Sequence, residues 1–152
     1  KTRARQPGVA VTFDLDHTEG TYASAQRLRE TYDQTWIVTP RHSIADDTSL
    51  VTRQGILRRL SRDGIRIAHL SEPRWTQRME SGALEIEQVY TGERTVLEPL
   101  AFLAYSTPRL PDQRLLPALR AANIETRLVG DCVMARNVMA AIAEGHAAGH
   151  AV

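Results

Sequence analysis

Two carboxylates lie two residues apart after an apolar segment near the start of the chain. The segment reads V-A-V-T-F-D-L-D-H-T-E-G from Val9 to Gly20, so Asp14 and Asp16 follow a run of strand-forming residues. Paired carboxylates at the end of a strand are candidates for nucleophilic or acid–base chemistry. The first question is whether these two residues form a catalytic site.

Three further side chains could carry chemistry, namely Cys132, His146 and His150. Cys132 is the only cysteine, which excludes an internal disulfide and a cysteine-based metal or iron–sulfur cluster within this chain. His146 and His150 share one face of a predicted helix, as metal-binding pairs do, but no third ligand accompanies them. We therefore predict no metal site here, and Cys132 is interpreted as a packing residue.

Hydrophobic periodicity predicts an α/β fold in which strands alternate with helices. We expect strands over residues 9–15, 36–38, 65–70 and 126–129, and helices over residues 21–32, 50–60, 115–122 and after 131. Asp46, Asp47 and Thr48 are candidate N-caps of the second helix, and Gly64 is placed to end it.

The stretch between the third and last predicted strands has a different pattern. Residues 84–89 alternate between apolar and polar side chains, Thr91-Gly92-Glu93 is a turn signal, and residues 95–105 are again apolar. This pattern indicates a β-hairpin or meander. The alternation of strands and helices around it implies a parallel sheet with right-handed crossovers, whose ligands bind at the carboxyl ends of the strands. Residues 14–20, 39–43 and 130–136 are predicted to lie at that edge.

The D-x-D-x-T motif resembles the first motif of the haloacid dehalogenase-like phosphohydrolases, which implies that Asp14 would attack phosphorus and Asp16 would handle the proton of the leaving group. Thr39, after the second strand, matches that family's phosphate-binding Ser or Thr, and L-V-G-D-C at residues 128–132 resembles its late acidic motif. That chemistry also needs a lysine and a second magnesium-binding carboxylate. No lysine follows Lys1, and the residues after Asp131 are Val, Met, Ala and Arg. A phosphohydrolase is therefore the alternative interpretation.

A second resemblance covers almost the whole chain. Its motifs are V-T-P-R-H-S, L-S-R-D-G-I-R-I, V-Y-T-G-E-R and the stretch R-L-V-G-D-C-V-M-A-R-N-V-M-A-A-I-A-E-G-H-A-A-G. Together they are similar to the C-terminal part of the trimethylamine dehydrogenase and 2,4-dienoyl-CoA reductase family of flavin-dependent oxidoreductases. The resemblance implies a Rossmann-like three-layer α/β domain of the NAD(P)- or FAD-binding type, with a central parallel sheet and a β-meander.

The resemblance also implies domains, cofactors and partners. Residues 1–128 would be a degenerate NAD(P)-binding-like subdomain, and residues 129–152 the closing strand and helix of an FAD- or ADP-binding lobe. Gly130, Asp131 and Cys132 would contact the FAD or ADP moiety shared with an upstream flavin lobe, at the start of the helix that follows. FMN and a 4Fe-4S cluster are expected in the other parts of the parent polypeptide, which include an N-terminal TIM barrel. No catalytic residue is expected in the present chain.

The first strand-to-helix turn departs from a working dinucleotide site. Such a site needs G-x-G-x-x-G, whereas Gly20 is the single glycine of this turn. Glu19 and Tyr22 would repel or crowd a diphosphate. Gly20, Thr39 and Arg41 are the candidate nucleotide contacts, with Arg41 placed to pair with a 2′-phosphate. We therefore expect NAD(P)H binding to be weakened or lost, or the whole chain to be a vestigial structural module without a ligand.

Composition sets the remaining limits. The chain has 152 residues and a formal net charge of +1, so no electrostatic field favours nucleic acid or an anionic membrane. No apolar run approaches the roughly 20 residues that span a bilayer. The single cysteine fits a cytoplasmic setting, and a homo-oligomer is possible. Because the sequence begins Lys-Thr-Arg without methionine, we expect it to be a piece of a longer polypeptide.

Overall fold

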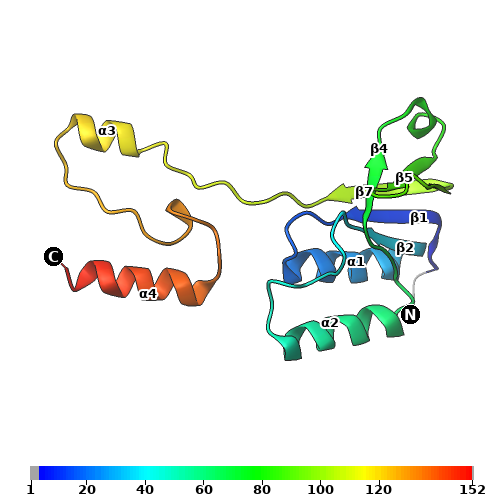
Figure 1. The fold of residues 1–152 in the computed structure, drawn as a ribbon, viewed down its shortest axis with the longest axis horizontal. Coiled ribbons are helices and arrows are strands. Elements are labelled where there is room, and N and C mark those ends of the chain that lie inside the picture. Colours follow the sequence, from blue (N-terminus) through cyan, green and yellow to red (C-terminus); the bar gives the residue numbers. More distant parts are fainter. Residues whose placement is uncertain (1–3, 152) are drawn as a thin grey trace. The chain divides into compact units, whose positions relative to one another are not determined.

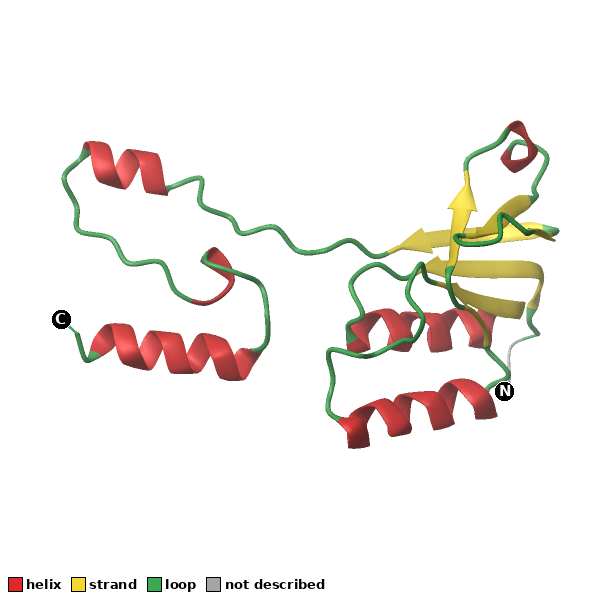
Figure 2. Cartoon of the chain, in the orientation of Figure 1, coloured by secondary structure: helices red, strands yellow, loops and turns green. Residues whose placement is uncertain are grey.

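The computed structural model describes residues 4–151. Its contacts divide the chain into two compact units, one through Thr107 and one from Pro108 (Figure 1). Unit 1 holds all the strands of the described residues, and unit 2 holds helices and loops (Figure 2). The boundary expected between residues 128 and 129 separates two functional domains, and it stays a prediction.

Unit 1 is built on a four-stranded parallel sheet in the order β3-β2-β1-β7. Its strands are β1 (Gln6–Phe13), β2 (Tyr32–Val38), β3 (Arg66–Ala68) and β7 (Leu100–Tyr105). Two helices, α1 (Glu19–Thr31) and α2 (Leu50–Arg62), connect β1 to β2 and β2 to β3. The predicted strand–helix–strand–helix–strand order is confirmed.

A three-stranded antiparallel sheet forms the second part of unit 1. It runs in the order β4-β5-β6, from β4 (Ser71–Arg74) through β5 (Leu84–Gln88) to β6 (Arg94–Leu97), with a short helix η1 (Gln77–Met79) between β4 and β5. The turn predicted at Thr91-Gly92-Glu93 joins β5 to β6, and Gly92 has a φ of +70° there. This sheet is the predicted β-meander.

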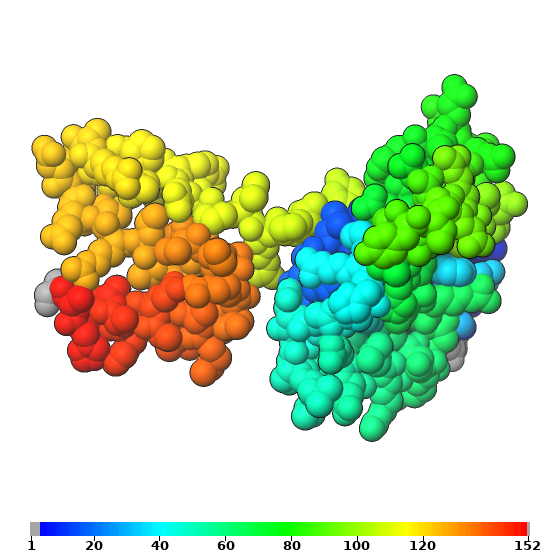
Figure 3. Space-filling view, viewed as in Figure 1, coloured from blue at the N-terminus to red at the C-terminus, as the bar shows by residue number. Residues whose placement is uncertain are grey.

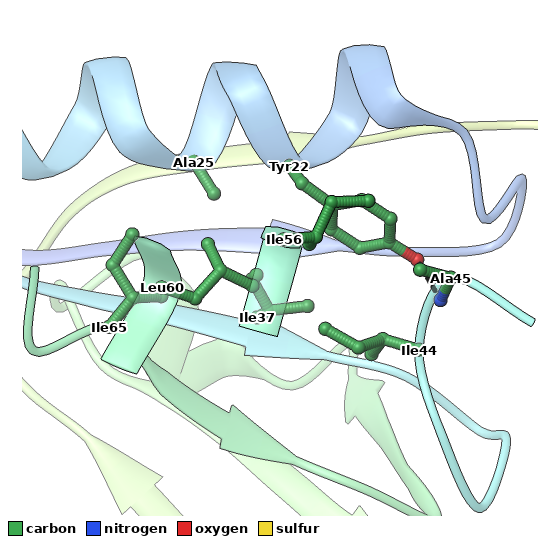
Figure 4. Packing of buried hydrophobic residues seen from close by; sticks show 8 residues of the cluster. All are labelled: Tyr22, Ala25, Ile37, Ile44, Ala45, Ile56, Leu60 and Ile65. Carbon is green, nitrogen blue, oxygen red and sulfur yellow. Dashed lines mark hydrogen bonds between the residues drawn. The ribbon is translucent and has the colours of Figure 1, made fainter. Parts of the chain in front are cut away.

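Two apolar clusters hold these elements in three layers. The first lies between the helices and the parallel sheet and comprises Tyr22, Ala25, Ile37, Ile44, Ala45, Ile56, Leu60 and Ile65 (Figure 4). The second lies between the parallel sheet and the meander and comprises Val9, Val11, Val38, Leu84, Ile86 and Leu97. Neighbouring residues such as Ile37 and Val38 point to opposite faces of β2, so both faces of the sheet are covered.

The topology follows from the handedness of parallel connections. The connections β1-α1-β2 and β2-α2-β3 move to one side of β1, so right-handed crossovers place α1 and α2 on one face. The chain then returns past β1 to β7, which requires a connection over the opposite face. The meander supplies it. Residues 95–105 therefore contribute to two sheets, because β6 ends at Leu97 in the meander and β7 begins at Leu100 in the parallel sheet.

The start of α2 differs from the prediction. Ser49 is its N-cap, and the Ser49 hydroxyl accepts the Thr52 N–H at 3.3 Å. Asp46, one of the predicted caps, instead accepts from Arg53 at 2.6 Å and from the Ser43 hydroxyl. Gly64, with a φ of +67°, lies just beyond the end of α2, as predicted.

Unit 2 contains α3 (Leu116–Ala121), a short helix η2 (Gly130–Cys132) and α4 (Val138–Gly149). The strand predicted over residues 126–129 is absent, because no other strand is described within this unit to pair with it. The last helix is confirmed, but it begins at Val138 rather than at the Gly130-Asp131 turn. Among residues 4–151, none of the helices has the length and apolar character needed to cross a bilayer.

Candidate nucleotide-binding sites

The carboxyl edge of the parallel sheet brings four loops of unit 1 together. The Asp14 N–H donates to the Val38 carbonyl at 2.8 Å, and the Ser106 N–H donates to the Phe13 carbonyl at 2.9 Å. Because β1 lies between β2 and β7, whose connections leave in opposite directions, the end of β1 is the topological switch point of the sheet. The structure thus places the predicted segments 14–20 and 39–43 at one site.

Asp14 is fully buried at this edge and both of its carboxylate oxygens are occupied. One accepts the His17 N–H at 2.9 Å, and the other accepts the Tyr22 hydroxyl at 2.8 Å. The Tyr22 oxygen also accepts the Ala45 N–H at 2.7 Å, so Tyr22 points into the core (Figure 4). The expectation that Tyr22 crowds a ligand at the turn was wrong, because its ring packs inward.

Asp16 closes the turn at the N-terminus of α1. Its carboxylate accepts the Thr18 N–H at 3.1 Å, the Thr18 hydroxyl at 3.0 Å and the Thr21 hydroxyl at 2.7 Å. Partial burial acts to raise the pKa of Asp16, but these hydrogen bonds outweigh it and hold the pKa below its ordinary value. A negative charge of the protein itself therefore occupies the positive end of α1.

Ser106 ties β7 to the same turn. Its hydroxyl accepts the Leu15 N–H at 3.1 Å and the Asp16 N–H at 3.3 Å. Backbone N–H groups of this turn are the donors that a dinucleotide fold directs at a diphosphate. Here the hydroxyl of Ser106, just beyond the end of β7, already accepts two of them.

His17 fills the centre of the turn. It is fully buried and has a φ of +55°, a conformation that glycine adopts more readily. Its Nε2 lies 3.5 Å from the Thr39 hydroxyl, and its Nδ1 has no hydrogen-bond partner among the described residues. Thr39 is itself fully buried, and its hydroxyl also accepts the Arg41 N–H at 3.3 Å. Thr39 is thus a structural residue of this edge.

The two other candidate contacts in unit 1 are exposed. Gly20 lies in the first turn of α1, where an added Cβ would meet only ordinary contacts, so the backbone does not require glycine there. Arg41 lies in the loop after β2, beside His42. Burial lowers the pKa of His69, and the charge of nearby His42 lowers it further. Arg41 and His42 thus follow β2, and His69 follows β3. The loop after β2 (cyan) lies against α2 (teal) in Figure 3.

The geometry does not suit a phosphohydrolase. The nucleophile of that reaction must reach phosphorus, but Asp14 is inaccessible and both of its oxygens are hydrogen-bonded. A magnesium site needs several oxygen ligands, and no group of three or more His, Cys, Asp or Glu residues suited to a metal occurs in residues 4–151. Asp14 and Asp16 are instead the residues that shape the turn.

A second candidate site lies in unit 2 at the Gly130-Asp131-Cys132 turn. Gly130 is buried with a φ of +62°, and a Cβ there would lie 3.2 Å from the Ala141 Cβ, so this position requires glycine. The Asp131 side chain is 62% exposed and lies 4.0 Å from the Arg109 guanidinium. Cys132 is exposed, and its carbonyl accepts the Gln113 side-chain amide at 2.7 Å.

Two residues that the sequence analysis missed stabilise this turn. Glu144 on α4 accepts the Gly130 N–H at 2.6 Å, and its other oxygen pairs with Arg136. The expected helix start at this turn was wrong. The N-terminus of α4 lies at Val138, where the Asn137 side chain accepts the Ala140 N–H at 2.9 Å. The R-x-x-x-x-A-I-x-E-G motif could have pointed to these contacts, since it contains Arg136, Ala141 and Glu144.

Solved structures with the same fold are longer polypeptides. Histamine dehydrogenase from Rhizobium sp. 4-9 matches with a TM-score of 0.75 and 20% identity, over 93% of this chain and 22% of its own length. The 6-hydroxypseudooxynicotine amine oxidase of Pseudomonas geniculata N1 gives 0.76 and 17%, over 94% and 22%. Thioredoxin reductase from Lactococcus lactis gives 0.67 and 14%, over 96% and 52%. No family model and no curated protein matches the chain.

The first two enzymes, with 2-naphthoyl-CoA reductase, are members of the trimethylamine dehydrogenase and old yellow enzyme-like family. The chain shares the fold of one part of these enzymes. The resemblance stated from the sequence is thereby confirmed at the level of the fold, which is Rossmann-like and of the type found in FAD- and NAD(P)-binding reductases. The chain spans only 22% of the length of histamine dehydrogenase.

Proposed function

We propose that this chain is the C-terminal dinucleotide-binding-type part of a multidomain flavin-dependent oxidoreductase. In this proposal unit 1 has weakened or lost NAD(P)H binding, while the Gly130-Asp131 turn contributes to an FAD or ADP site completed by an upstream flavin lobe. The proposal rests on the shared fold and on a difference between the two turns. The carboxylate of Asp16 is hydrogen-bonded within the turn after β1, whereas the carboxylate of Asp131 is exposed at the turn in unit 2. The FMN, the 4Fe-4S cluster and the TIM barrel belong to the same proposal, as parts of the parent outside this chain.

The closed first turn is the observation that carries the loss of NAD(P)H binding. Asp16 places a negative charge at the N-terminus of α1, and Glu19 adds a second carboxylate in the first turn of that helix. A diphosphate at this helix end would meet two like charges instead of free N–H donors. The residues of the first turn therefore do not fit a bound dinucleotide, although Arg41 is exposed after β2 for a 2′-phosphate.

The turn in unit 2 fits a cofactor through a different group. Gly130 lets the backbone pass close to α4, and the exposed Asp131 carboxylate is an acceptor suited to sugar or ribityl hydroxyls rather than to a diphosphate. When bound, FAD would supply the redox chemistry. The residues of this chain would hold its hydroxyl groups and orient it.

A calorimetric titration tests the proposal directly. We expect the 152-residue chain to release no heat with NADH or NADPH, and the full-length protein to bind FAD with its upstream lobe present. Micromolar affinity of the chain for NADPH would contradict the loss of pyridine-nucleotide binding, and Arg41→Ala would then show whether the 2′-phosphate is recognised. A full-length protein without flavin would favour a vestigial structural module. The cytoplasmic location and a homo-oligomeric state stay predictions.

A further inference from the structure

We propose that Glu144 is a positioning residue that holds the Gly130-Asp131 turn so that the Asp131 carboxylate faces a cofactor hydroxyl. The inference rests on the proposed function of this turn. It assigns to α4 the task of shaping the cofactor contact through Glu144, without any contact between Glu144 and the cofactor.

Glu144 connects three segments of unit 2. Its Oε2 accepts the N–H of Gly130 at 2.6 Å, across fourteen residues of sequence. Its Oε1 pairs with the Arg136 guanidinium from the loop that precedes α4. A carboxylate that accepts both a backbone N–H and a guanidinium forms charge-assisted hydrogen bonds, which are shorter and stronger than neutral ones. The turn, the loop and the helix are therefore fixed through one side chain.

Ala141 supports the same arrangement from the same face of α4. Residues three apart on a helix lie side by side, so Ala141 and Glu144 both approach the turn. A Cβ on Gly130 would lie 3.2 Å from the Ala141 Cβ and 3.6 Å from its Cα. The close approach of the glycine backbone to α4 is what brings the Gly130 N–H within reach of Glu144.

The charges divide the roles of the two carboxylates. Glu144 has a side chain that is 31% exposed, and both of its oxygens are used within the protein. Asp131 has a side chain that is 62% exposed, and its carboxylate lies 4.0 Å from the Arg109 guanidinium. Arg136 offsets the charge of Glu144, so the turn presents one carboxylate outward. Asp131 is the group that can accept from a ligand, and Glu144 sets its position.

The test uses the full-length protein and its affinity for FAD, measured by flavin fluorescence after removal of the cofactor. Glu144→Ala removes both contacts, whereas Glu144→Gln keeps an oxygen that can accept the Gly130 N–H. We expect FAD affinity to fall about tenfold in Glu144→Ala and by less than about threefold in Glu144→Gln. Glu30→Ala is the matched control, because Glu30 forms an exposed ion pair with Arg27 on a helix of unit 1. It should bind FAD like the wild type.

Two further measurements separate positioning from folding. Hydrogen exchange of the peptide over residues 128–134 should accelerate in Glu144→Ala, while the thermal midpoint of the cofactor-free protein stays within about 2 °C of the wild type. If Glu144→Ala does not fold, Glu144→Asp replaces it, since it withdraws the carboxylate from Gly130 by one methylene and should also weaken FAD binding.

Each outcome decides the inference. Unchanged FAD affinity in Glu144→Ala, or in Glu144→Asp where that variant replaces it, overturns it and leaves the proposed function intact. Equal losses in Glu144→Ala and Glu144→Gln also overturn it, because they show that the contact with the Gly130 N–H, which glutamine can keep, does not set the affinity for FAD. A wild-type protein that binds no FAD overturns the proposed function itself, and with it this inference.

Discussion

Tyr22 donates its phenolic hydrogen to the buried carboxylate of Asp14 over 2.8 Å, and the same oxygen accepts the Ala45 N–H at 2.7 Å. One hydroxyl thus joins the end of β1, the helix α1 and the loop after β2. Burial, followed by the charge of Asp14, raises the pKa of Tyr22 far above its ordinary value, so the hydroxyl keeps its hydrogen throughout the physiological range.

Tyr22→Phe should lower the free energy of unfolding by about 2 to 3 kcal/mol, because it leaves the Asp14 carboxylate and the Ala45 N–H without their partner in a buried place. Urea unfolding of the 152-residue chain measures the loss. Tyr90→Phe is the control, since Tyr90 is 79% exposed, and we expect it to change stability by less than about 0.5 kcal/mol. Equal losses in the two variants would mean that the hydroxyl bridge contributes nothing.

Asp16→Asn should make the chain less stable at neutral pH, by about 0.5 to 1 kcal/mol, because it removes a charge from the N-terminus of α1. The folded-state pKa of Asp16 is lowered from 3.8, so this contribution is present above that value and is lost as pH falls through the folded pKa. The stabilities of wild type and variant should therefore converge as the pH falls below 3.8 and through the lowered folded-state pKa of Asp16. Glu93→Gln, in an exposed turn, serves as the control. A difference that grows toward low pH would contradict the role given to Asp16.

Gly8→Ala should destabilise unit 1 by about 2 to 3 kcal/mol, through both backbone strain and overpacking. Gly8 has a φ of +112°, and an added Cβ would lie 2.9 Å from the Ala101 Cβ and 2.9 Å from the Pro99 carbonyl oxygen. Gly64→Ala is matched, because its φ is +67° with nothing within 4 Å of the added Cβ, and it should cost only about 1 kcal/mol. Chemical unfolding compares the pair. A smaller loss of unfolding free energy for Gly8→Ala than for Gly64→Ala would show that β7 shifts easily to make room for the added methyl group.

Ser49→Ala should cost about 1 kcal/mol, because the Ser49 hydroxyl caps α2 by accepting the Thr52 N–H. Asp47→Ala tests the cap expected from the sequence and should be nearly neutral. Thermal unfolding of both variants distinguishes the two positions. Should Asp47→Ala prove the more harmful, α2 would begin earlier in solution than at Leu50.

The sequence predicted the layers of unit 1 well because its signals there are local. The buried strand expected over residues 36–38 lies within β2, and Gly64 with its positive φ lies just beyond α2, as expected. Residues 95–105 were expected to be one apolar segment, but Glu98-Pro99 interrupts it, and the strands on either side, β6 and β7, belong to different sheets. β7 pairs with β1 in the parallel sheet.

Segments 14–20 and 39–43 lie at the predicted edge of the sheet, whereas segment 130–136, expected at the same edge, belongs to unit 2, where no strand is described. Segment positions follow from strand ends, whereas the direction of a side chain depends on distant packing. Tyr22 was expected beside a ligand and lies in the core. Ser106, whose hydroxyl accepts the Asp16 N–H, is far from Asp16 in sequence and carries no motif. The strand expected over residues 126–129 depends on a partner that unit 2 does not provide.

The position of β1 in the sheet order β3-β2-β1-β7 bears on how the chain is made. β1 leaves the ribosome well before its neighbour β7, which follows only after both helices and the whole meander. During synthesis one edge of β1 stays open while the other is already paired with β2. A nascent chain halted within the meander would therefore expose an unpaired apolar strand, and such edges are sites of wrong association.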